Sequence, residues 1–456
     1  MGGMQTRAEV VVVGGGLAGL AAAAFAARGG AAVTLLERSA HAGGRARTRD
    51  QDGYLFNVGA HALYRGGPGM KALNDLGVAV AGRRPPGAGL ALMDGVAHPL
   101  PAGPRALLVS RLLGLRSKLA LARLLPRLAA GKVRAPRGAS VDEWLRAEGL
   151  RPDAAGFLLA LARVTTYSHQ PELFDAAALV GQLRLALREG VLYLDGGWQS
   201  LVDGLAAAAR DTGARLEVKA KVEALDFDAR GHVCGVRVEG TRHPATAVVL
   251  AAPPEEAARL AGERAPALRA AAGRLVPARA ATLDLCLRRL PRPDTFALGI
   301  DRPLYFSVHS ATARLAPGGG ALVHLMRYLG SDRPAPDEAE RELEASMDAV
   351  QPGWRAEVQV KRFVPELVVA HDLPRADRGG VEGRTPVAVP EVPGLFLAGD
   401  WVGAEGLLAD ASLASGRAAG LAGAAEAQVR PLGVWGRSGE AAVSPQCGRP
   451  GSARSA

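Results

Sequence analysis

Residues 11–48 constrain the fold of this chain more than any other segment. They read VVVGGGLAGLAAAAFAARGGAAVTLLERSAHAGGRART. A short apolar run leads into a glycine-rich turn, an alanine-rich helical stretch follows, and a second apolar run over residues 33–36 ends at Glu37. The order of strand, glycine turn, helix, strand and acid is typical of a dinucleotide-binding βαβ unit.

The glycines of the turn stand where such a unit needs them. Gly14 permits a tight turn, Gly16 lets the backbone approach a pyrophosphate, and Gly19 lets the helix pack close to the strand. Free N–H groups at the start of the helix face the phosphates, and the helix dipole favours their negative charge. The predicted contacts are Gly14, Gly15, Gly16, Leu17, Ala18 and Gly19, with Glu37 accepting the ribose hydroxyls. The alternative is an ordinary tight turn between a strand and a helix.

A second glycine pair follows Glu37 and bears on which nucleotide is bound. A nicotinamide site needs nothing there. A longer cofactor needs a loop whose backbone its pyrophosphate can approach, and a cation to neutralise that pyrophosphate. Gly43 and Gly44 provide such a loop, and Arg45 carries a planar set of donors suited to phosphate.

With these residues the chain resembles the flavin-containing amine oxidoreductase superfamily, whose N-terminal signature ends E-x5-G-G-R-x-x-T. Glu37, Gly43, Gly44, Arg45 and Thr48 match it, and the resemblance is strong over residues 9–66. The superfamily includes amine oxidases, protoporphyrinogen oxidases and carotenoid desaturases. The resemblance implies FAD as cofactor and an α/β fold, in which a Rossmann-like FAD-binding domain of the GR2 type is interleaved with an α+β substrate domain.

The same resemblance implies cofactor contacts elsewhere in the chain. It places the backbone of Gly59 and Ala60 against the isoalloxazine ring, with His61 nearby as a candidate catalytic group. Near the C-terminus an apolar strand ends in Gly399 and Asp400, where a carboxylate can accept a ribityl hydroxyl. The remaining implied contacts are Arg38, the backbone of Val222 at the adenine, and Ser412 and Leu413 at the start of a helix directed at the flavin.

Two of these segments also have simpler interpretations. Residues 59–61 are alternatively a glycine-containing turn with a surface histidine. The C-terminal block is alternatively a plain strand and helix, in which Asp410 or Ser412 caps the helix.

A chain of 456 residues suits two interleaved domains. We expect residues 1–70, 195–265 and 385–427 to form a discontinuous FAD-binding domain. Residues 71–194, mainly helical, and 266–384, rich in strands, would form the substrate domain. We expect one strand over residues 215–222, and we expect residues 428–456, rich in Gly, Ser, Pro and Arg, to be a disordered tail.

Residues 105–137 combine basic and apolar side chains. No acid stands between Asp94 and Asp142, and leucines alternate with the basic residues Arg105, Arg111, Arg116, Lys118, Arg123, Arg127, Lys132, Arg134 and Arg137. One interpretation is peripheral contact with an anionic membrane. The other is a pair of helices in the substrate domain with a solvated arginine face. Few aromatics and no recognition motif accompany the charge, so we expect no nucleic-acid partner.

The remaining composition narrows the setting of the protein. The three cysteines are widely spaced and form no CxxC, so neither a disulfide framework nor a zinc site is indicated, and we predict no metal. The first residues lack a signal-peptide pattern. We expect a cytoplasmic protein that is either free or membrane-associated.

Two features bear on the reaction. Amine oxidases of the superfamily usually carry a lysine near the flavin, and this chain has no lysine between Lys221 and Lys361. They also tend to carry an aromatic in the turn before the last flavin helix, which here reads GLLA over residues 406–409. The segments FNVGAHALYRGG and LFLAGDW look more like the carotenoid-desaturase branch. We therefore expect hydride transfer from a hydrophobic substrate, for example an isoprenoid. The alternatives are an amine oxidase and a non-catalytic binding protein on the same fold.

Overall fold

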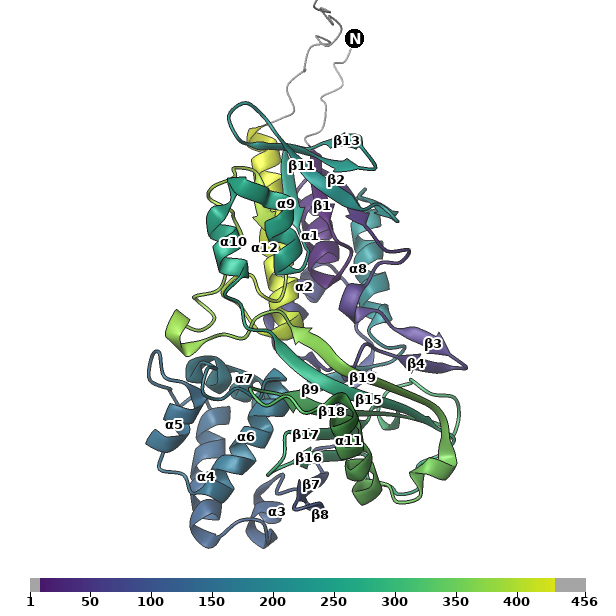
Figure 1. Cartoon of the computed structure of the whole chain (residues 1–456), viewed down its shortest axis with the longest axis vertical. Coiled ribbons are helices and arrows are strands. Elements are labelled where there is room, and N and C mark those ends of the chain that lie inside the picture. Colours follow the sequence, from purple (N-terminus) through teal and green to yellow (C-terminus); the bar gives the residue numbers. More distant parts are fainter. Residues whose placement is uncertain (1–8, 431–456) are drawn as a thin grey trace, which may run out of the picture.

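The computed structural model describes residues 9–430, which form two lobes (Figure 1). The upper lobe is built on a parallel five-stranded sheet of order β10-β2-β1-β14-β20. Its strands are β1 (Glu9–Val13), β2 (Ala32–Glu37), β10 (Arg215–Val218), β14 (Ala247–Leu250) and β20 (Leu395–Leu397). These strands come from three distant parts of the chain.

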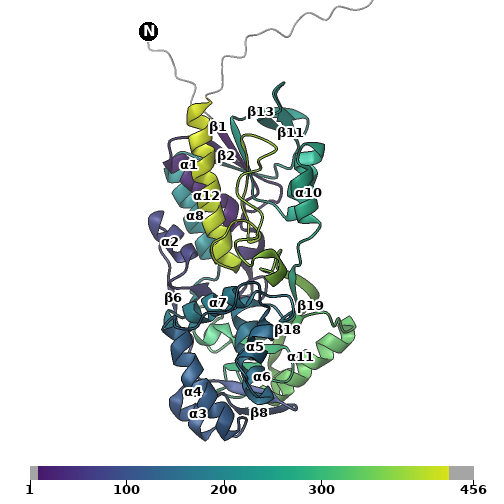
Figure 2. The ribbon, with the colours of Figure 1, turned by 90° about the vertical axis from the view of Figure 1, so that its left-hand side faces the viewer.

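Helices cover one face of this sheet. They are α1 (Leu17–Arg28), α2 (Pro68–Asp75), α8 (Gln199–Asp211) and α12 (Leu408–Val429), and Figure 2 shows α12 lying along α1. The two helices approach closely because their facing residues are small. A Cβ on Gly416 would lie 2.4 Å from the carbonyl oxygen of Ala18, and one on Gly420 would lie 2.4 Å from that of Ala22. The alanine-rich sequence of α1 therefore serves close helix packing.

The other face of the sheet is covered by a three-stranded sheet and two short helices. These are β11 (Val222–Phe227), β12 (Val233–Val238), β13 (Thr241–Pro244), α9 (Pro254–Ala261) and α10 (Pro266–Ala272). The prediction of one strand over residues 215–222 was wrong. Lys219 takes a left-handed φ of 59° and breaks the strand, and the amide of Ala220 then donates to the carbonyl of Glu37. This turn sets Val222 beside the end of β2.

The lower lobe contains a mixed seven-stranded sheet of order β19-β15-β18-β17-β16-β7-β8. Its strands are β7 (Leu90–Met93), β8 (Val96–Pro99), β15 (Ala278–Leu287), β16 (Phe296–Gly299), β17 (Leu304–Val308), β18 (Ala321–Leu329) and β19 (Val358–Ala370). Helix α11 (Pro336–Val350) packs on one face. The opposite face packs against α3 (Pro104–Val109), α4 (Leu115–Ala129), α5 (Val141–Ala147), α6 (Pro152–Thr166) and α7 (Ala176–Arg188).

Short strands connect the two lobes. They are β3 (Arg49–Gln51) with β4 (Tyr54–Phe56), and β5 (Leu63–Tyr64), β9 (Val191–Leu194) and β6 (Gly82–Arg83). Helix α12 begins at Leu408 rather than near Ser412 and continues to Val429, so residues 428–429 belong to it and not to a tail. Residues 431–456 of the predicted tail lie outside the described residues. Within residues 9–430, no helix combines the length and the apolar character needed to cross a bilayer.

Candidate functional site

A cavity of about 410 Å³ lies between the lobes and collects most of the predicted site residues. Its lining includes Gly14, Gly15, Gly16, Leu17, Ala18, Glu37, Arg38, Gly43, Gly44, Arg45, Gly59, Ala60, His61, Val222, Gly399, Asp400 and Ser412. Two predicted residues, Gly19 and Leu413, are absent from the lining. The volume is within the range of small-molecule pockets.

The glycine turn after β1 is held by contacts that exclude side chains. Gly14 has a φ of +107°, and a Cβ there would lie 2.3 Å from the carbonyl oxygen of Ala251. A Cβ on Gly19 would lie 1.8 Å from the carbonyl oxygen of Gly14, so Gly19 acts in packing rather than at the cavity. At Gly16 a Cβ would meet nothing within 4 Å. The turn thus leaves open space beside the start of α1, which fits a pyrophosphate.

Glu37 lies at the end of β2 with its carboxylate buried against the turn. Its Oε2 accepts from the amide of Gly15 at 2.6 Å, and its Oε1 accepts from the amide of Ser39 at 2.7 Å and from the Ser39 hydroxyl. Each carboxylate oxygen has two lone pairs. Glu37 can therefore hold the turn and still accept from a ribose hydroxyl.

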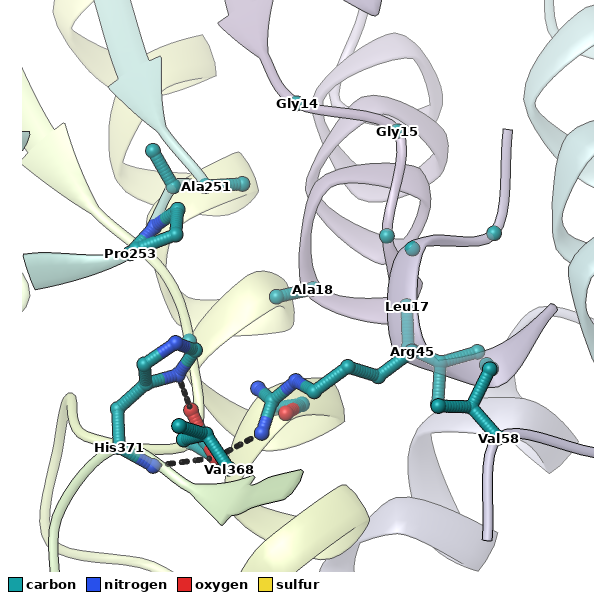
Figure 3. Close-up of a pocket in the computed structure, with 18 of the residues that line it drawn as sticks. Gly14, Gly15, Leu17, Ala18, Arg45, Val58, Ala251, Pro253, Val368 and His371 are labelled. Carbon is teal, nitrogen blue, oxygen red and sulfur yellow. Dashed lines mark hydrogen bonds and ion pairs between the residues drawn. The ribbon is translucent and has the colours of Figure 1, made fainter. Parts of the chain in front are cut away.

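Arg45 and Asp400 form an ion pair in the cavity (Figure 3). Nη1 of Arg45 donates to Oδ2 of Asp400 at 2.9 Å and to the carbonyl of Val369 at 2.7 Å. His371 also donates to Asp400, from its amide at 3.0 Å and from Nδ1 at 2.9 Å. Burial opposes ionisation of Asp400, but the charge of Arg45 and the bonds from His371 and Arg45 outweigh it and hold the pKa of Asp400 well below its usual range. Arg45 and Asp400, which the sequence analysis assigned to separate cofactor contacts, therefore lie in one cluster.

The start of α12 differs from the prediction. Asp410 does not cap this helix: its Oδ1 accepts from the amide of Gly69 at 3.1 Å, in the first turn of α2. Burial raises the pKa of Asp410 to about 7, although the Gly69 bond opposes the rise. Ser412 lines the cavity and donates from its hydroxyl to the carbonyl of Leu408 at 3.3 Å. Leu413 is fully buried among the residues of α1 and the sheet and does not line the cavity, so the predicted cofactor contact at Leu413 is not seen.

His61 faces the cavity rather than the outer surface. Its ring lies 4.8 Å from the ring of Trp198, and its Nδ1 is 2.9 Å from the carbonyl of Gly59. A carbonyl can only accept, so Nδ1 carries the proton and Nε2 is left as an acceptor. Burial, helped by the nearby charges of His324 and Arg45, lowers the pKa of His61 to about 4, although the bond to Gly59 opposes the fall. The ring is therefore neutral at pH 7.

Several residues that the sequence did not indicate also line this end of the cavity. They are Tyr167, Trp198, Met326, Leu367, Val368, Val369 and His371. Residues 406–409 contribute Leu408 and Ala409 to the cavity, and neither of these is aromatic. Two aromatic rings nevertheless reach the cavity from other elements, so its lining is not free of them. The glycine pair before Trp198 marks a sharp turn in the sequence and is a signal that could have drawn attention to this residue.

A buried polar network lies behind this end, on the face of the lower sheet that carries Met326. Nδ1 of His324 is 2.7 Å from Oδ1 of Asp284, and both side chains are almost fully buried. His309 lies next to His324, with ring centroids 4.7 Å apart, and its Nε2 is 3.2 Å from the hydroxyl of Tyr305. Nε2 of His324 has no partner among the described residues. No spacing in the sequence indicated this acid–histidine pair.

Two further observations concern the lysine at the cavity and the side chains that could hold a metal ion. The lysine that lines the cavity is Lys221, beside Val222 and Glu256 and therefore at the end near β11 and α9. Across residues 9–430, no three His, Cys, Asp or Glu side chains are placed to hold a metal ion.

Comparison with known proteins bears on the family and the fold. Residues 17–421 match the protein family described as flavin containing amine oxidoreductase. A carotenoid 3,4-desaturase from Haloarcula japonica is 49% identical over 51 residues, which cover 11% of this chain and 10% of that protein. The match therefore spans only about a tenth of the relative's length.

Solved structures with the same fold have different activities. An oxidoreductase from Methanosarcina mazei has a TM-score of 0.70 at 20% identity, over 89% of this chain and 98% of that one. A triple mutant of putrescine oxidase has a TM-score of 0.69 at 17% identity, over 91% and 98%. A reduced UDP-galactopyranose mutase reaches 0.67 at 14% identity, over 92% and 96%. At these identities the likeness shows the fold alone.

The family match extends from α1 into α12 and includes the GGR loop and the Gly399-Asp400 pair. The chain therefore belongs to the flavin-containing amine oxidoreductase family and is an FAD-dependent oxidoreductase.

Proposed function

We propose that this enzyme takes a hydride from a hydrophobic substrate, for example an isoprenoid, in a desaturase-like or dehydrogenase-like reaction with flavin N5 as acceptor. The observation that carries the proposal is the apolar lining opposite the glycine turn, formed by Ala60, Met326, Leu367, Val369 and Leu408. An apolar chain gains free energy on leaving water for such a lining. A substrate ammonium ion would need a polar partner there. The short match to a carotenoid 3,4-desaturase favours the same substrate class.

We propose cofactor contacts from the place of each residue along the cavity. The adenosine end is assigned to Glu37, Arg38 and the backbone of Val222. The pyrophosphate is assigned to the backbone of residues 14–18, Gly43 and Gly44 and to the guanidinium of Arg45. The flavin end is assigned to Gly59, Ala60, Gly399, Asp400 and Ser412. When bound, FAD supplies a hydride acceptor at its N5 atom.

The chain's own contribution is to position the substrate, exclude water and accept a proton. Forming a double bond removes one hydride and one proton. The proton needs an acceptor near the substrate, and we propose Nε2 of His61, since that ring lines the cavity in its neutral form. A pKa of about 4 makes His61 a weak base, so its role depends on the position of the ring beside the substrate, and the ring releases the proton readily at pH 7. We also propose the division into an FAD-binding domain (1–70, 195–265, 385–427) and a substrate domain (71–194, 266–384).

An amine oxidase remains the second candidate. Tyr167 and Trp198 favour it, because aromatic faces attract cations. The lining of the cavity near His61 contains no lysine among the described residues, and this weighs against it. The family assignment makes the protein an enzyme, so the non-catalytic alternative is set aside.

The two candidates are separated by anaerobic reduction of the flavin. The purified holoenzyme is mixed with an acyclic polyene isoprenoid in micelles, or with a set of primary and secondary amines. We expect the isoprenoid to bleach the oxidised flavin band and the amines to leave it unchanged. Bleaching by an amine with peroxide release in air, and none by the isoprenoid, would reject the proposal in favour of amine oxidation.

We also propose that the protein meets a membrane through α3 and α4. Leu108, Val109, Leu115 and Leu119 are 50–70% exposed. The buried side of α4 is formed by other residues, including Leu121, Leu124 and Leu128. Arg105, Arg111, Arg116 and Arg123 are exposed in the same segment. An exposed apolar cluster among basic side chains suits the headgroup region of an anionic bilayer.

Flotation with liposomes tests the membrane proposal. We expect binding to vesicles of anionic phospholipid, weaker binding at high salt, and none to zwitterionic vesicles. Changing Leu115 and Leu119 together to Ser should abolish flotation, whereas Leu421→Ser, at an exposed position on α12, should leave it unchanged. Absence of binding to anionic vesicles at low salt would reject the proposal.

A further inference from the structure

A second cavity lies beside the cofactor cavity and takes no part in the function proposed above. Its volume is about 410 Å³, and the two cavities share no lining residue. It is formed by the end of α10, the residues that follow β19, and the turn at Ala376–Arg378. In Figure 1 this turn is the yellow-green segment at the left, below α10. Four arginines line the cavity: Arg274, Arg375, Arg378 and Arg384.

Arg384 is the most informative of the four because it is 7% exposed. Its Nη1 donates to the carbonyl of Gly406 at 2.8 Å. Its buried Nε has no hydrogen-bond partner among residues 9–430. No described acid forms an ion pair with its guanidinium within 4.0 Å. A buried cation with an unused donor is costly, and such a group often marks the place of an ion or ligand.

The remaining charges leave the cavity positive. Arg375 is paired with Asp377 on the same turn. Arg274 and Arg378 form no ion pair with the part of the chain that the structure describes. The acid in the lining is Asp372, whose Oδ1 accepts from the amide of Val276 at 3.3 Å. Burial raises the pKa of Asp372 to about 6, while the charges of Arg384 and Arg378 oppose the rise. One carboxylate therefore faces three guanidinium groups that Asp377 does not neutralise.

We infer that this cavity binds a small polyanion that carries phosphate or carboxylate groups. Guanidinium groups donate in a planar fork that matches both kinds of oxyanion. A ligand of two or three negative charges would balance the excess of arginine charge in the cavity, including that of the buried Arg384. A monoanion such as chloride could not balance three guanidinium groups across a cavity of this size.

The site is placed to influence the cofactor cavity. His371 lines the cofactor cavity and bonds Asp400, whereas the next residue, Asp372, lines the second cavity. Arg384 is near enough to Asp400 for its charge to be felt there, and it holds the loop that leads into α12 through Gly406. A bound polyanion would thus change the electrostatic surroundings of the Arg45–Asp400 pair.

The test is calorimetric titration of the FAD-loaded protein with inorganic pyrophosphate, inorganic phosphate or citrate at constant ionic strength. The bound FAD keeps these anions out of the cofactor cavity. We expect saturable binding of at least one polyanion and none of chloride. Arg378→Gln and Arg274→Gln should each weaken binding about tenfold, as expected for loss of one charge-assisted bond. Preference for pyrophosphate or for citrate would identify the ligand as a phosphate or a carboxylate.

Arg341→Gln is the matched control, since Arg341 pairs with Asp337 on the exposed side of α11. It should bind the anion as the wild type does. All three variants should retain the flavin absorbance, which shows that they are folded. Lack of binding to the holoprotein, binding to the apoprotein alone, or equal affinity in the Arg378, Arg274 and Arg341 variants would overturn the inference. None of these outcomes would bear on the proposed reaction, because that reaction is tested by anaerobic reduction of the flavin.

Discussion

The cofactor cavity has two walls that keep their shape by different means. The glycine wall comprises residues 14–18 and 43–45, with Gly19 packed directly behind Gly14. A Cβ would lie 2.3 Å from a carbonyl oxygen at Gly14 and 1.8 Å from one at Gly19. In the sheet wall, which comprises the residues of β15, β17 and β18 behind His61, buried side chains bond one another. Asp284 of β15 bonds His324 of β18, and Tyr305 of β17 bonds His309, which follows that strand. The first wall depends on the absence of side chains, and the second depends on pairs of them.

The difference predicts where each wall is fragile. A glycine wall fails when an atom is added, because main-chain atoms have no room to move aside. A sheet wall fails when a partner is removed, because a buried polar group is then left without its hydrogen bond. The following predictions test this contrast, from the largest expected effect to the smallest.

Gly19→Ala should have the largest effect. The new Cβ would meet the carbonyl oxygen of Gly14, so we expect a loss of more than about 4 kcal/mol in the free energy of unfolding. Gly16→Ala is the matched control, since its Cβ would meet nothing. That variant should unfold like the wild type without cofactor but bind FAD more weakly. Urea unfolding of both apoproteins gives the measurement, and equal stability of Gly19→Ala and wild type would refute the close contact.

Asp410→Asn should change how stability depends on pH. Asp410 is 2% exposed, and its folded pKa of about 7 exceeds the unfolded value of about 3.9. The folded state therefore binds the extra proton between these pH values, and wild-type stability falls as pH rises through that window, by about 4 kcal/mol. Asparagine keeps an acceptor for Gly69 and removes the titration.

Urea unfolding at pH 5 and pH 8 checks this prediction. The asparagine variant should lack the part of the wild-type decline that Asp410 causes, so it should be the more stable protein at pH 8. A decline of equal size in both proteins would show that Asp410 is not the titrating group.

Asp284→Ala tests the sheet wall by removing a partner. It leaves the buried ring of His324 without its one side-chain hydrogen bond within residues 9–430, and we expect a loss of about 2–3 kcal/mol in stability. Asp284→Asn, which keeps an acceptor at the same place, should cost less. Thermal unfolding ranks the three proteins. If the two variants were equally unstable, packing rather than the hydrogen bond would account for the role of Asp284.

Arg45→Ala should weaken FAD binding, and it should also cost some stability because the buried Asp400 then keeps only His371 as a partner. Arg45 is partly exposed, and its lost donors would weaken FAD binding about 10- to 100-fold through the missing phosphate contact. The FAD affinity of Arg45→Lys should lie between that of Arg45→Ala and that of the wild type, because lysine keeps the charge but not the planar set of donors. Flavin fluorescence titration of the apoproteins measures the affinities. Unchanged affinity in Arg45→Ala would count against the contact and leave Arg45 as a partner of Asp400 alone.

Local errors in the sequence-based prediction have local physical causes. The strand expected over residues 215–222 is broken by the left-handed Lys219, a conformation that composition does not reveal. Helix α12 starts at Leu408, four residues before Ser412, so Leu408 and Ala409 are already helical. Asp410 accepts a hydrogen bond from Gly69 of α2 instead of capping its own helix. The aromatic rings at the cavity come from α6 and from the turn before α8, so the turn at residues 406–409 could not indicate them.

The sequence by itself determined the cofactor class and the parallel lobe that carries the glycine wall. It could do so because the strand, turn, helix and acid of residues 9–37 are neighbours in the chain, and their spacing follows directly from backbone geometry. Only the tertiary structure decided the Arg45–Asp400 pair, 355 residues apart, the Asp284–His324 pair, 40 residues apart, and the arginine-lined cavity. These contacts depend on strand register and on the packing of distant segments, which no local pattern in the chain specifies.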